Sequence, residues 1–309
     1  MPQFEFISLQ KSNTFKMPEA TVLCLGNFDG VHSAHRTLLR KAKQQRDTKF
    51  PNASCGVLCF RGLSSDFLSD TVTPHLSTEE GRLRDFFDAG MEFAILCDFP
   101  SLRRMSAEDF INEILLRECH CVATVCGFNY RFGEFGAGNA KTLEARFGDS
   151  AYTEPPFLLD GIPVSSTRIR QALLEGRTEE ATAMLGHPYR FESLVLHGKK
   201  LGRTIGIPTL NQAFPEKMLI PLHGVYITDC KIGDRTFRGV TNVGVHPTVD
   251  SEAPVNAETY LLDFADEVYG RDVEISFLRY LRPERRFGNL EELKACIALD
   301  IEAARAYRQ

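Results

Sequence analysis

The sequence predicts a two-domain protein: an α/β domain with a parallel sheet, followed by an all-β domain that ends in one helix. The chain has 309 residues, and a single hydrophobic core stops growing at about 250–300 residues. Early in the chain, apolar runs alternate with stretches of helical period. After Gly186 the pattern changes to short β-type runs separated by Gly, Pro and Asn. We therefore expect domains at residues 1–186 and 187–309.

The elements of the first domain follow from that alternation. Helical patterns run from Ser33 to about Gln45 and from Ser106 to Leu116, and Ser77–Glu80 has the residues of a helix start. Strands that alternate with helices of about 10–15 residues are typical of βαβ units and a parallel sheet. Four short apolar runs predict the buried strands, at residues 20–25, 55–60, 93–97 and 121–126.

The second domain contains short strand patterns without helices between them. A final helix is expected at about residues 289–307. Such a succession is typical of an antiparallel sandwich or barrel, and the residues alone leave that choice open. The predicted strands lie at residues 190–196, 225–231, 236–243, 257–264 and 273–281.

Composition and charge exclude several classes of protein. Hydrophobic residues make up 43% and charged residues 25%, which excludes a collagen-like, coiled-coil or mostly disordered chain. The net charge is −5, and neither half forms a basic body, so we expect no sequence-independent binding to nucleic acid. A bound phosphate should therefore lie in a local pocket.

The apolar runs and the cysteines predict a cytoplasmic protein without membrane spans. No run approaches the about 20 apolar residues that cross a bilayer, and Met1–Lys16 does not resemble a secretory signal. There are nine cysteines, most of them inside apolar runs, and no C-x-x-C pair. We expect buried, reduced thiols and no cysteine metal site.

The first candidate site directly follows the first strand. In Gly26–His35, the glycines Gly26 and Gly30 allow a tight turn and close approach of a phosphate. A helix N-terminus follows, with unpaired N–H groups and a positive dipole end. His32 and His35, three apart, share one helix face and could hold the triphosphate of ATP. Two alternatives remain: histidines that bind a metal, or histidines that only cap and pack.

The second candidate site is a glycine-rich basic loop at residues 197–211. Gly198, Gly202 and Gly206 recur among Lys199, Lys200 and Arg203. A cationic loop rich in N–H groups suits a polyphosphate. No GxxxxGK(S/T) is present, so it is not a P-loop. The alternative is a glycine-rich turn with solvated cations.

Together with later segments, these motifs resemble a known family over about residues 16–306. Gly127–Gly133 reads GFNYRFG and matches a GxNFxFG element, while Val164–Arg170 reads VSSTRIR and matches (I/V)SSTxIR. The basic loop matches GxxxGRxxGxPTxN, and Glu258–Phe264 corresponds to an E-(T/V)-H-x-x-D-F strand, with Tyr260 in place of the usual His. The chain resembles the bacterial bifunctional riboflavin kinase/FMN adenylyltransferases (FAD synthetases).

For the first domain, the resemblance implies a Rossmann-like nucleotidylyltransferase fold. Its signature HxGH corresponds to His32, Ser33, Ala34 and His35, and it implies that the two histidines are catalytic. The residues implied to bind ATP and phosphate are Gly26, Phe28, Asp29, Gly30, Asn129, Ser166, Thr167 and Arg168.

For the second domain, the resemblance implies a riboflavin-kinase-type antiparallel β-barrel. Glu258 would be the general base for the ribityl 5′-hydroxyl. Thr209 and Asn211 would hold Mg²⁺ and the ATP phosphates, since hard oxygen ligands suit Mg²⁺. The residues implied to bind ATP or flavin are Gly198, Gly202, Arg203, Gly206, Pro208, Thr209 and Asn211.

The implied activity is the synthesis of flavin cofactors in two steps. The second domain would phosphorylate riboflavin to FMN with MgATP, giving ADP. The first would transfer AMP from a second ATP to FMN, giving FAD and pyrophosphate. Two departures leave alternatives open: Ala34 stands where the family usually has Gly, and Phe60–Ser64 replaces an F-x-P-H-P stretch.

The first alternative is a riboflavin kinase with a degenerate adenylyltransferase domain. The second is a non-catalytic flavin-binding or regulatory protein. The sequence leaves open whether the chain forms a homo-oligomer.

Overall fold

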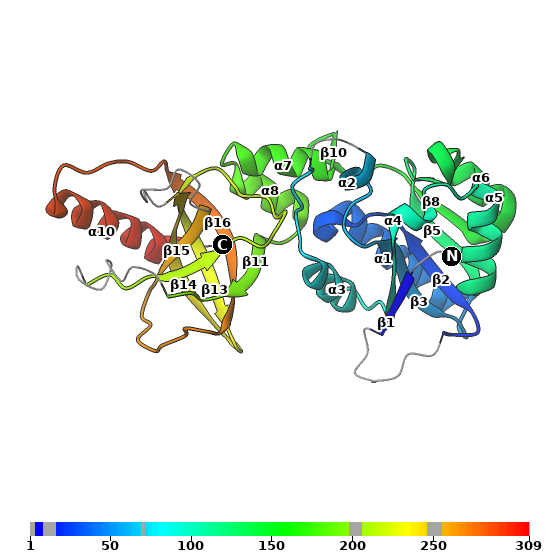
Figure 1. Ribbon diagram of the computed structural model, residues 1–309, viewed down its shortest axis with the longest axis horizontal. Helices are drawn as coiled ribbons and strands as arrows, with labels where there is room; N and C mark the ends of the chain where they lie inside the picture. Colours follow the sequence, from blue (N-terminus) through cyan, green and yellow to red (C-terminus); the bar gives the residue numbers. More distant parts are fainter. Residues whose placement is uncertain (1–3, 9–16, 69–71, 198–205, 246–254, 309) are drawn as a thin grey trace. The chain divides into compact units, whose positions relative to one another are not determined.

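The computed structural model describes residues 4–8, 17–68, 72–197, 206–245 and 255–308 (Figure 1). The chain forms two compact units, which divide between Ser166 and Thr167; residues 76–78 group with the second unit. This division lies before residue 186, because helices α7 (Ser166–Leu174) and α8 (Thr178–Leu185) pack with the second unit. The Leu173 carbonyl, for example, accepts a hydrogen bond from the Leu222 amide at 3.0 Å. The predicted limits of the functional domains stay a prediction.

The first unit contains a six-stranded sheet of the predicted kind. The strand order is β1-β4-β3-β2-β5-β8, and every pair is parallel except β1 with β4. All four predicted strands are confirmed, and β1 and β8 are additional edge strands. The strands are β1 (Phe4–Ser8), β2 (Thr21–Leu25), β3 (Ser54–Phe60), β4 (Phe93–Cys97), β5 (Cys121–Gly127) and β8 (Ala151–Glu154).

Helices cover both faces of this sheet (Figure 1). Alternate residues of each strand point to opposite faces. Val57 packs with α1 (Ser33–Lys49) and α3 (Glu79–Asp88), whereas Leu58 packs with the π-helical segment η2 (Phe110–Glu118) and with α6 (Ala140–Phe147). The two resulting apolar layers hold the carboxyl ends of β2, β3 and β5 in place.

Several short elements complete the first unit. The predicted helix from Ser106 begins as α5 (Ala107–Asp109) with Ser106 as its N-cap and continues as η2. The remaining short helices are η1 (Asp29–Val31), α2 (Ser65–Leu68), α4 (Phe99–Leu102), η3 (Glu134–Gly136) and η4 (Gly148–Ser150). The remaining short strands are β6 (Arg131–Phe132), β7 (Gly138–Asn139), β9 (Leu158–Leu159) and β10 (Ile162–Pro163).

The second unit contains an antiparallel sheet of six strands in the order β11-β16-β13-β14-β15-β12. All five predicted strands and the final helix are confirmed, and β12 is additional. The elements are β11 (Tyr189–Leu194), β12 (Leu210–Ala213), β13 (Gly224–Ile232), β14 (Arg235–Val245), β15 (Val255–Leu261), β16 (Asp272–Arg282) and α10 (Leu290–Ala306).

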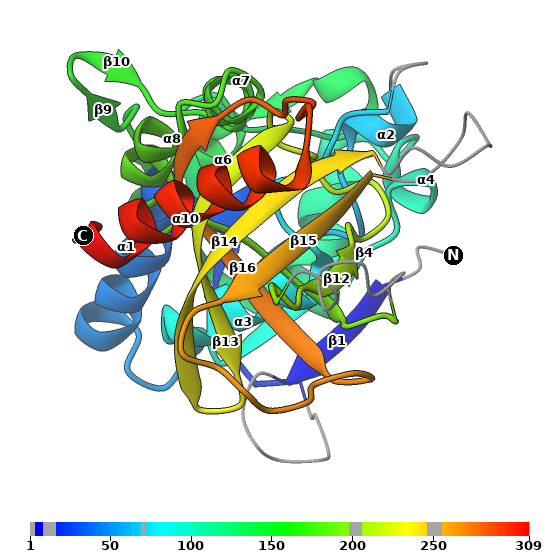
Figure 2. The same ribbon diagram turned by 90° about the vertical axis from the view of Figure 1, so that its left-hand side faces the viewer.

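The sheet is strongly curled (Figure 2), and its two edges contact each other. A bridge joins Leu196, just after β11, to Asn211 on β12, and the buried Gln212 amide donates to the Ser193 carbonyl at 2.7 Å. Inside the curl, the hydroxyls of Thr228, Thr241 and Thr259 form a buried chain at 2.7 and 2.8 Å. These contacts favour the barrel over the sandwich.

All nine cysteines are buried and free, as predicted. Burial raises the pKa of the Cys59 thiol to about 11, because a buried thiolate loses its hydration. In the described ranges, no helix has both the length and the apolar character that crossing a membrane requires.

Candidate active sites

The loop between β2 and α1 forms the first candidate site, at the carboxyl end of the parallel sheet. Its backbone has positive φ at Phe28 (55°), Gly30 (75°) and Val31 (36°). Such conformations are unfavourable for residues other than glycine, especially for a β-branched valine. The fully buried Phe28 ring holds the loop, since it packs 5.1 Å from the His35 ring and 5.4 Å from Phe86. Phe28 therefore shapes the loop, and only its backbone is left to meet a phosphate.

The two predicted histidines lie together at the start of α1. Their rings stack with centroids 3.6 Å apart, and Nδ1 of the buried His32 accepts a hydrogen bond from the His35 amide at 3.4 Å. His32 is thus the N-cap of the helix, so the capping role is real. With Nδ1 accepting, the proton of a neutral His32 lies on Nε2, which can donate to a ligand.

His35 is neutral at physiological pH. Burial, and secondarily the neighbouring His32, lower its pKa well below the usual value of 6.5, because the low-dielectric surroundings disfavour the imidazolium. Its Nδ1 is buried and has no hydrogen-bond partner among the described residues. Among the described residues, no group of three or more His, Cys, Asp or Glu could hold a metal ion.

Of the other residues predicted for the first site, Ser166 contacts this loop directly. The Ser166 hydroxyl donates to the Asp29 carbonyl at 3.2 Å, across 137 residues of sequence. Asn129 is exposed in the turn after β5, which pairs in parallel with β2. Thr167 and Arg168 belong to the second compact unit, where Arg168 contacts Glu180 at 3.2 Å. Their role toward the loop stays a prediction.

The second candidate site is a row of polar residues across three neighbouring strands. In the antiparallel register, Glu258 of β15 lies opposite Asn211 of β12 on one side and Asn242 of β14 on the other. Directly opposed residues point to the same face of a sheet. The strand register therefore brings one carboxylate and two amides together. Asn242 was not among the predicted site residues, because only its place opposite Glu258 distinguishes it.

This row lies on the face of the sheet that α10 covers, opposite the buried threonine chain. Along the same strands, Val240 and Tyr260 join an apolar cluster with Ala304 of α10. The Asn242 amide donates to Glu284 at 2.9 Å. A polar row beside an apolar cluster can take a ligand that has both polar and aromatic parts.

The predicted cation ligands lie at the start of β12. The Asn211 amide nitrogen approaches the Thr209 carbonyl at 3.5 Å, which turns its amide oxygen away from that contact. Hydroxyl and amide oxygens next to a carboxylate are a donor set that suits Mg²⁺. Gly206 has φ 81°, and Pro208 leads into the strand. The predicted residues Gly198, Gly202 and Arg203 lie outside the described residues.

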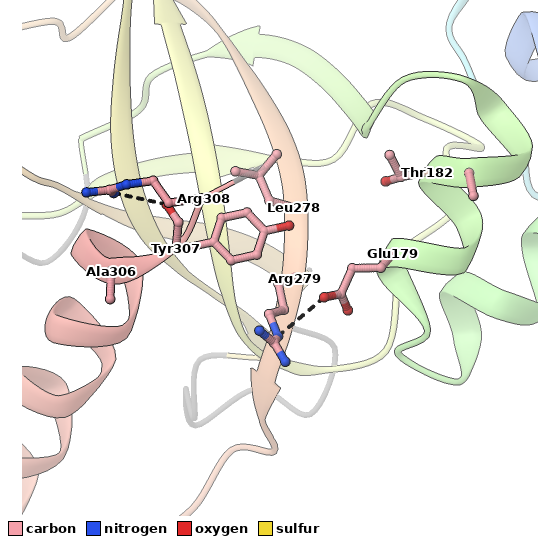
Figure 3. A pocket seen from close by; sticks show the side chains of 8 residues that line it. Glu179, Thr182, Leu278, Arg279, Ala306, Tyr307 and Arg308 are labelled. Atoms are coloured by element: carbon pink, nitrogen blue, oxygen red, sulfur yellow. Dashed lines mark hydrogen bonds and ion pairs between the residues drawn. The ribbon is translucent and has the colours of Figure 1, made fainter.

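A hollow of about 540 Å³ in the second unit contains none of the predicted kinase residues (Figure 3). Figure 3 shows Glu179 of α8 paired with Arg279 of β16; the two charged groups approach to 3.4 Å. The neighbouring Arg282 makes an ion pair with the buried Asp300 at 2.7 Å. These two arginines therefore contact carboxylates of their own chain.

Comparison with known proteins identifies the family. A family model described as riboflavin kinase matches residues 185–308, and one described as FAD synthetase matches residues 14–168. The bifunctional riboflavin kinase/FMN adenylyltransferase of Escherichia coli K12 is 32% identical over 295 residues, which cover 94% of this chain and 93% of that protein. The chain belongs to this family of bifunctional riboflavin kinase/FMN adenylyltransferases.

Further relatives support the same assignment to the riboflavin kinase/FMN adenylyltransferase family. The protein of that description from Haemophilus influenzae is 33% identical over 301 residues, 96% of each chain. The one from Bacillus subtilis is 32% identical and covers 93% of this chain and 92% of that protein. A crystal structure of a macrolide-efflux protein from Streptococcus pneumoniae superposes with a TM-score of 0.86 at 28% identity, covering 97% of this chain and 98% of that one. The resemblance inferred from the motifs is thus confirmed over nearly the whole chain.

Proposed function

We propose that this chain makes both flavin cofactors: FMN from riboflavin, and FAD from FMN. The row of Asn211, Glu258 and Asn242 carries the proposal for the kinase, because the barrel register assembles it from three strands. The loop between β2 and α1 supports adenylyl transfer, since a strained turn and a helix N-terminus meet there. The order of the two matched families agrees with this division.

In the kinase reaction, Glu258 accepts the proton of the ribityl 5′-hydroxyl as its oxygen attacks the γ-phosphorus of ATP. FMN forms and ADP leaves. A carboxylate within hydrogen-bond reach of the hydroxyl makes this step faster. Thr209 and Asn211 would hold Mg²⁺, which neutralises charge on the phosphates when it is bound. The polar row orients the ribityl chain, and the neighbouring apolar cluster suits the flavin ring.

In adenylyl transfer, a phosphate oxygen of FMN attacks the α-phosphorus of ATP. A phosphoanhydride bond forms, and pyrophosphate leaves. No covalent intermediate with the protein is required, so catalysis consists of positioning and stabilisation of charge. The first N–H groups of α1 donate to the triphosphate. The Nε2–H of His32 donates to it as well, since Nδ1 already accepts from the His35 amide.

Product analysis tests the proposal. The purified chain is given riboflavin and MgATP, and separately FMN and MgATP, and flavins are resolved by chromatography. We expect FMN and FAD in the first mixture, and FAD and pyrophosphate in the second. FMN without FAD would favour a kinase whose first unit is inactive. Riboflavin binding without any phosphorylation would favour a non-catalytic flavin-binding protein.

The proposed substrates and products are riboflavin, FMN, FAD, ATP, ADP and pyrophosphate. We propose Mg²⁺ as the metal and the cytoplasm as the place of action, without a nucleic-acid or membrane partner. Titrating Mg²⁺ in the kinase assay tests the metal: we expect no FMN in the presence of excess chelator and recovery when Mg²⁺ is restored.

A further inference from the structure

Arg82 on α3 is a buried arginine beneath the first candidate site. Its side chain reaches the carboxyl end of the parallel sheet, although only 3% of the residue is exposed. It donates to the carbonyls of Asn27 at 3.1 Å, Phe60 at 3.1 Å and Gly62 at 3.4 Å. One guanidinium thus joins the loop after β2 to the segment after β3.

The charge of Arg82 has no counter-ion in the described part of the chain. Its hydrogen bonds there go to neutral carbonyl oxygens, and no described carboxylate lies within ion-pair distance. Other arginines of this unit do have such partners: Arg36 contacts Asp85 at 3.2 Å and Arg46 contacts Glu92 at 2.7 Å. A buried cation without a counter-ion is unfavourable unless an anion binds near it.

Arg82 lies beside the loop that is proposed above to bind the triphosphate. Ligands of open parallel sheets bind at the carboxyl ends of the strands, and Asn27 belongs to the loop assigned above to the triphosphate. Asn27 also donates to the Ser64 hydroxyl at 3.0 Å, which ties the same two segments together a second time. Phe86, one helical turn after Arg82, packs against Phe28 at 5.4 Å. Helix α3 therefore supports the loop at two points.

We propose that Arg82 is a positioning residue for adenylyl transfer. It holds the loop between β2 and α1 in its strained conformation through the Asn27 carbonyl. Its fixed positive charge also favours the polyphosphate that the loop binds, since a charge buried in a low-dielectric site is weakly screened. This inference rests on the proposed adenylyltransferase function of the first unit.

The test compares Arg82→Met with Arg82→Lys in the full chain. Methionine keeps much of the apolar length and removes the charge, whereas lysine keeps the charge and can still donate to a carbonyl. With FMN in excess, we expect Arg82→Met to raise the KM for ATP at least about tenfold, with a smaller change in kcat. Arg82→Lys should restore most of the affinity. Riboflavin phosphorylation by the same chains should be unchanged.

A matched control separates this role from stability. Arg46→Met removes a half-buried arginine of the same unit whose partner Glu92 accepts from the Cys55 amide, at the amino end of β3. It should lower the Tm and leave the KM for ATP unchanged.

Three results would overturn the inference. A KM for ATP in Arg82→Met equal to that of the unaltered chain would show that the charge does not act on the nucleotide. If Arg82→Lys and Arg82→Met raise the KM for ATP equally, and both lower the Tm, then Arg82 has a packing role only. If the unaltered chain makes no FAD, the proposed function is itself wrong and the inference falls with it.

Discussion

The two candidate sites are built from different parts of the chain. The adenylyltransferase site depends mainly on backbone, with the His32 side chain as an added donor: φ is positive at Phe28, Gly30 and Val31, and N–H groups are available at the start of α1. The kinase site depends on side chains: Asn211, Glu258 and Asn242, aligned by strand register. A backbone site stabilises charge without moving a proton, whereas a side-chain site with a carboxylate can take one. The two sites should therefore respond differently to substitution and to pH.

The largest expected effect is on the kinase. Glu258→Ala should lower kcat for FMN formation by at least about 10²-fold, the usual scale for a lost general base. FAD formation from supplied FMN should not change. Initial rates of both reactions on the same preparation check this.

Glu258→Gln serves as the matched control, because it keeps the shape and removes the basic group. Its kinase rate should fall about as far as that of Glu258→Ala. An unchanged rate in either variant would remove Glu258 from its proposed role.

The opposite selectivity is expected in the first unit. His32→Ala removes both the donor toward the triphosphate and the cap of α1, and loss of one such donor costs about 10²-fold in rate. FAD formation should fall by that amount while FMN formation is spared. Equal loss of both activities would contradict two separate sites.

A smaller effect on the same loop tests its backbone. Gly30 has φ 75°, so Gly30→Ala strains the turn by about 1 kcal/mol or more. We expect FAD formation to fall about tenfold, measured as kcat/KM for ATP.

Gly148→Ala is the control for Gly30→Ala, since Gly148 also has positive φ and a Cβ there would meet nothing within 4 Å. It should lower Tm by a similar amount without affecting FAD formation. If both glycine variants lose FAD formation equally, the effect is general instability.

The last expected effect, on stability and not on rate, is the pH dependence that His35 confers on the first unit. Its folded pKa lies below the unfolded value of about 6.5, so the unfolded chain binds more protons below that pH. The free energy of unfolding should therefore fall as pH falls through 6.5, by at most about 1.4 kcal/mol per pH unit. Urea denaturation between pH 7.5 and 5 measures it. His35→Gln should flatten the dependence, and a slope unchanged by that substitution would contradict the assignment.

Secondary structure was predictable where the pattern was strong and local. The buried strands of the first unit are mostly apolar, and Phe93–Cys97 is apolar throughout. The missed strands lack such a pattern. β1 (FEFIS) mixes polar and apolar residues at a sheet edge, and β12 (LNQA) carries two amides. Each forms a strand because a neighbouring strand, β4 or β15, offers backbone N–H and C=O groups for pairing. That partner is supplied by the sheet and leaves no pattern in the segment itself.

The sequence by itself determined the order of two domains, the motif-bearing loops and the family, because these depend on local residue types and spacing. Only the tertiary structure decided which residues meet. It placed Asn242 opposite Glu258, brought Ser166 to Asp29, and put the buried charge of Arg82 under the loop at Asn27. The physical reason is that strand register and helix packing join residues far apart in the chain, and no short-range pattern records those distances.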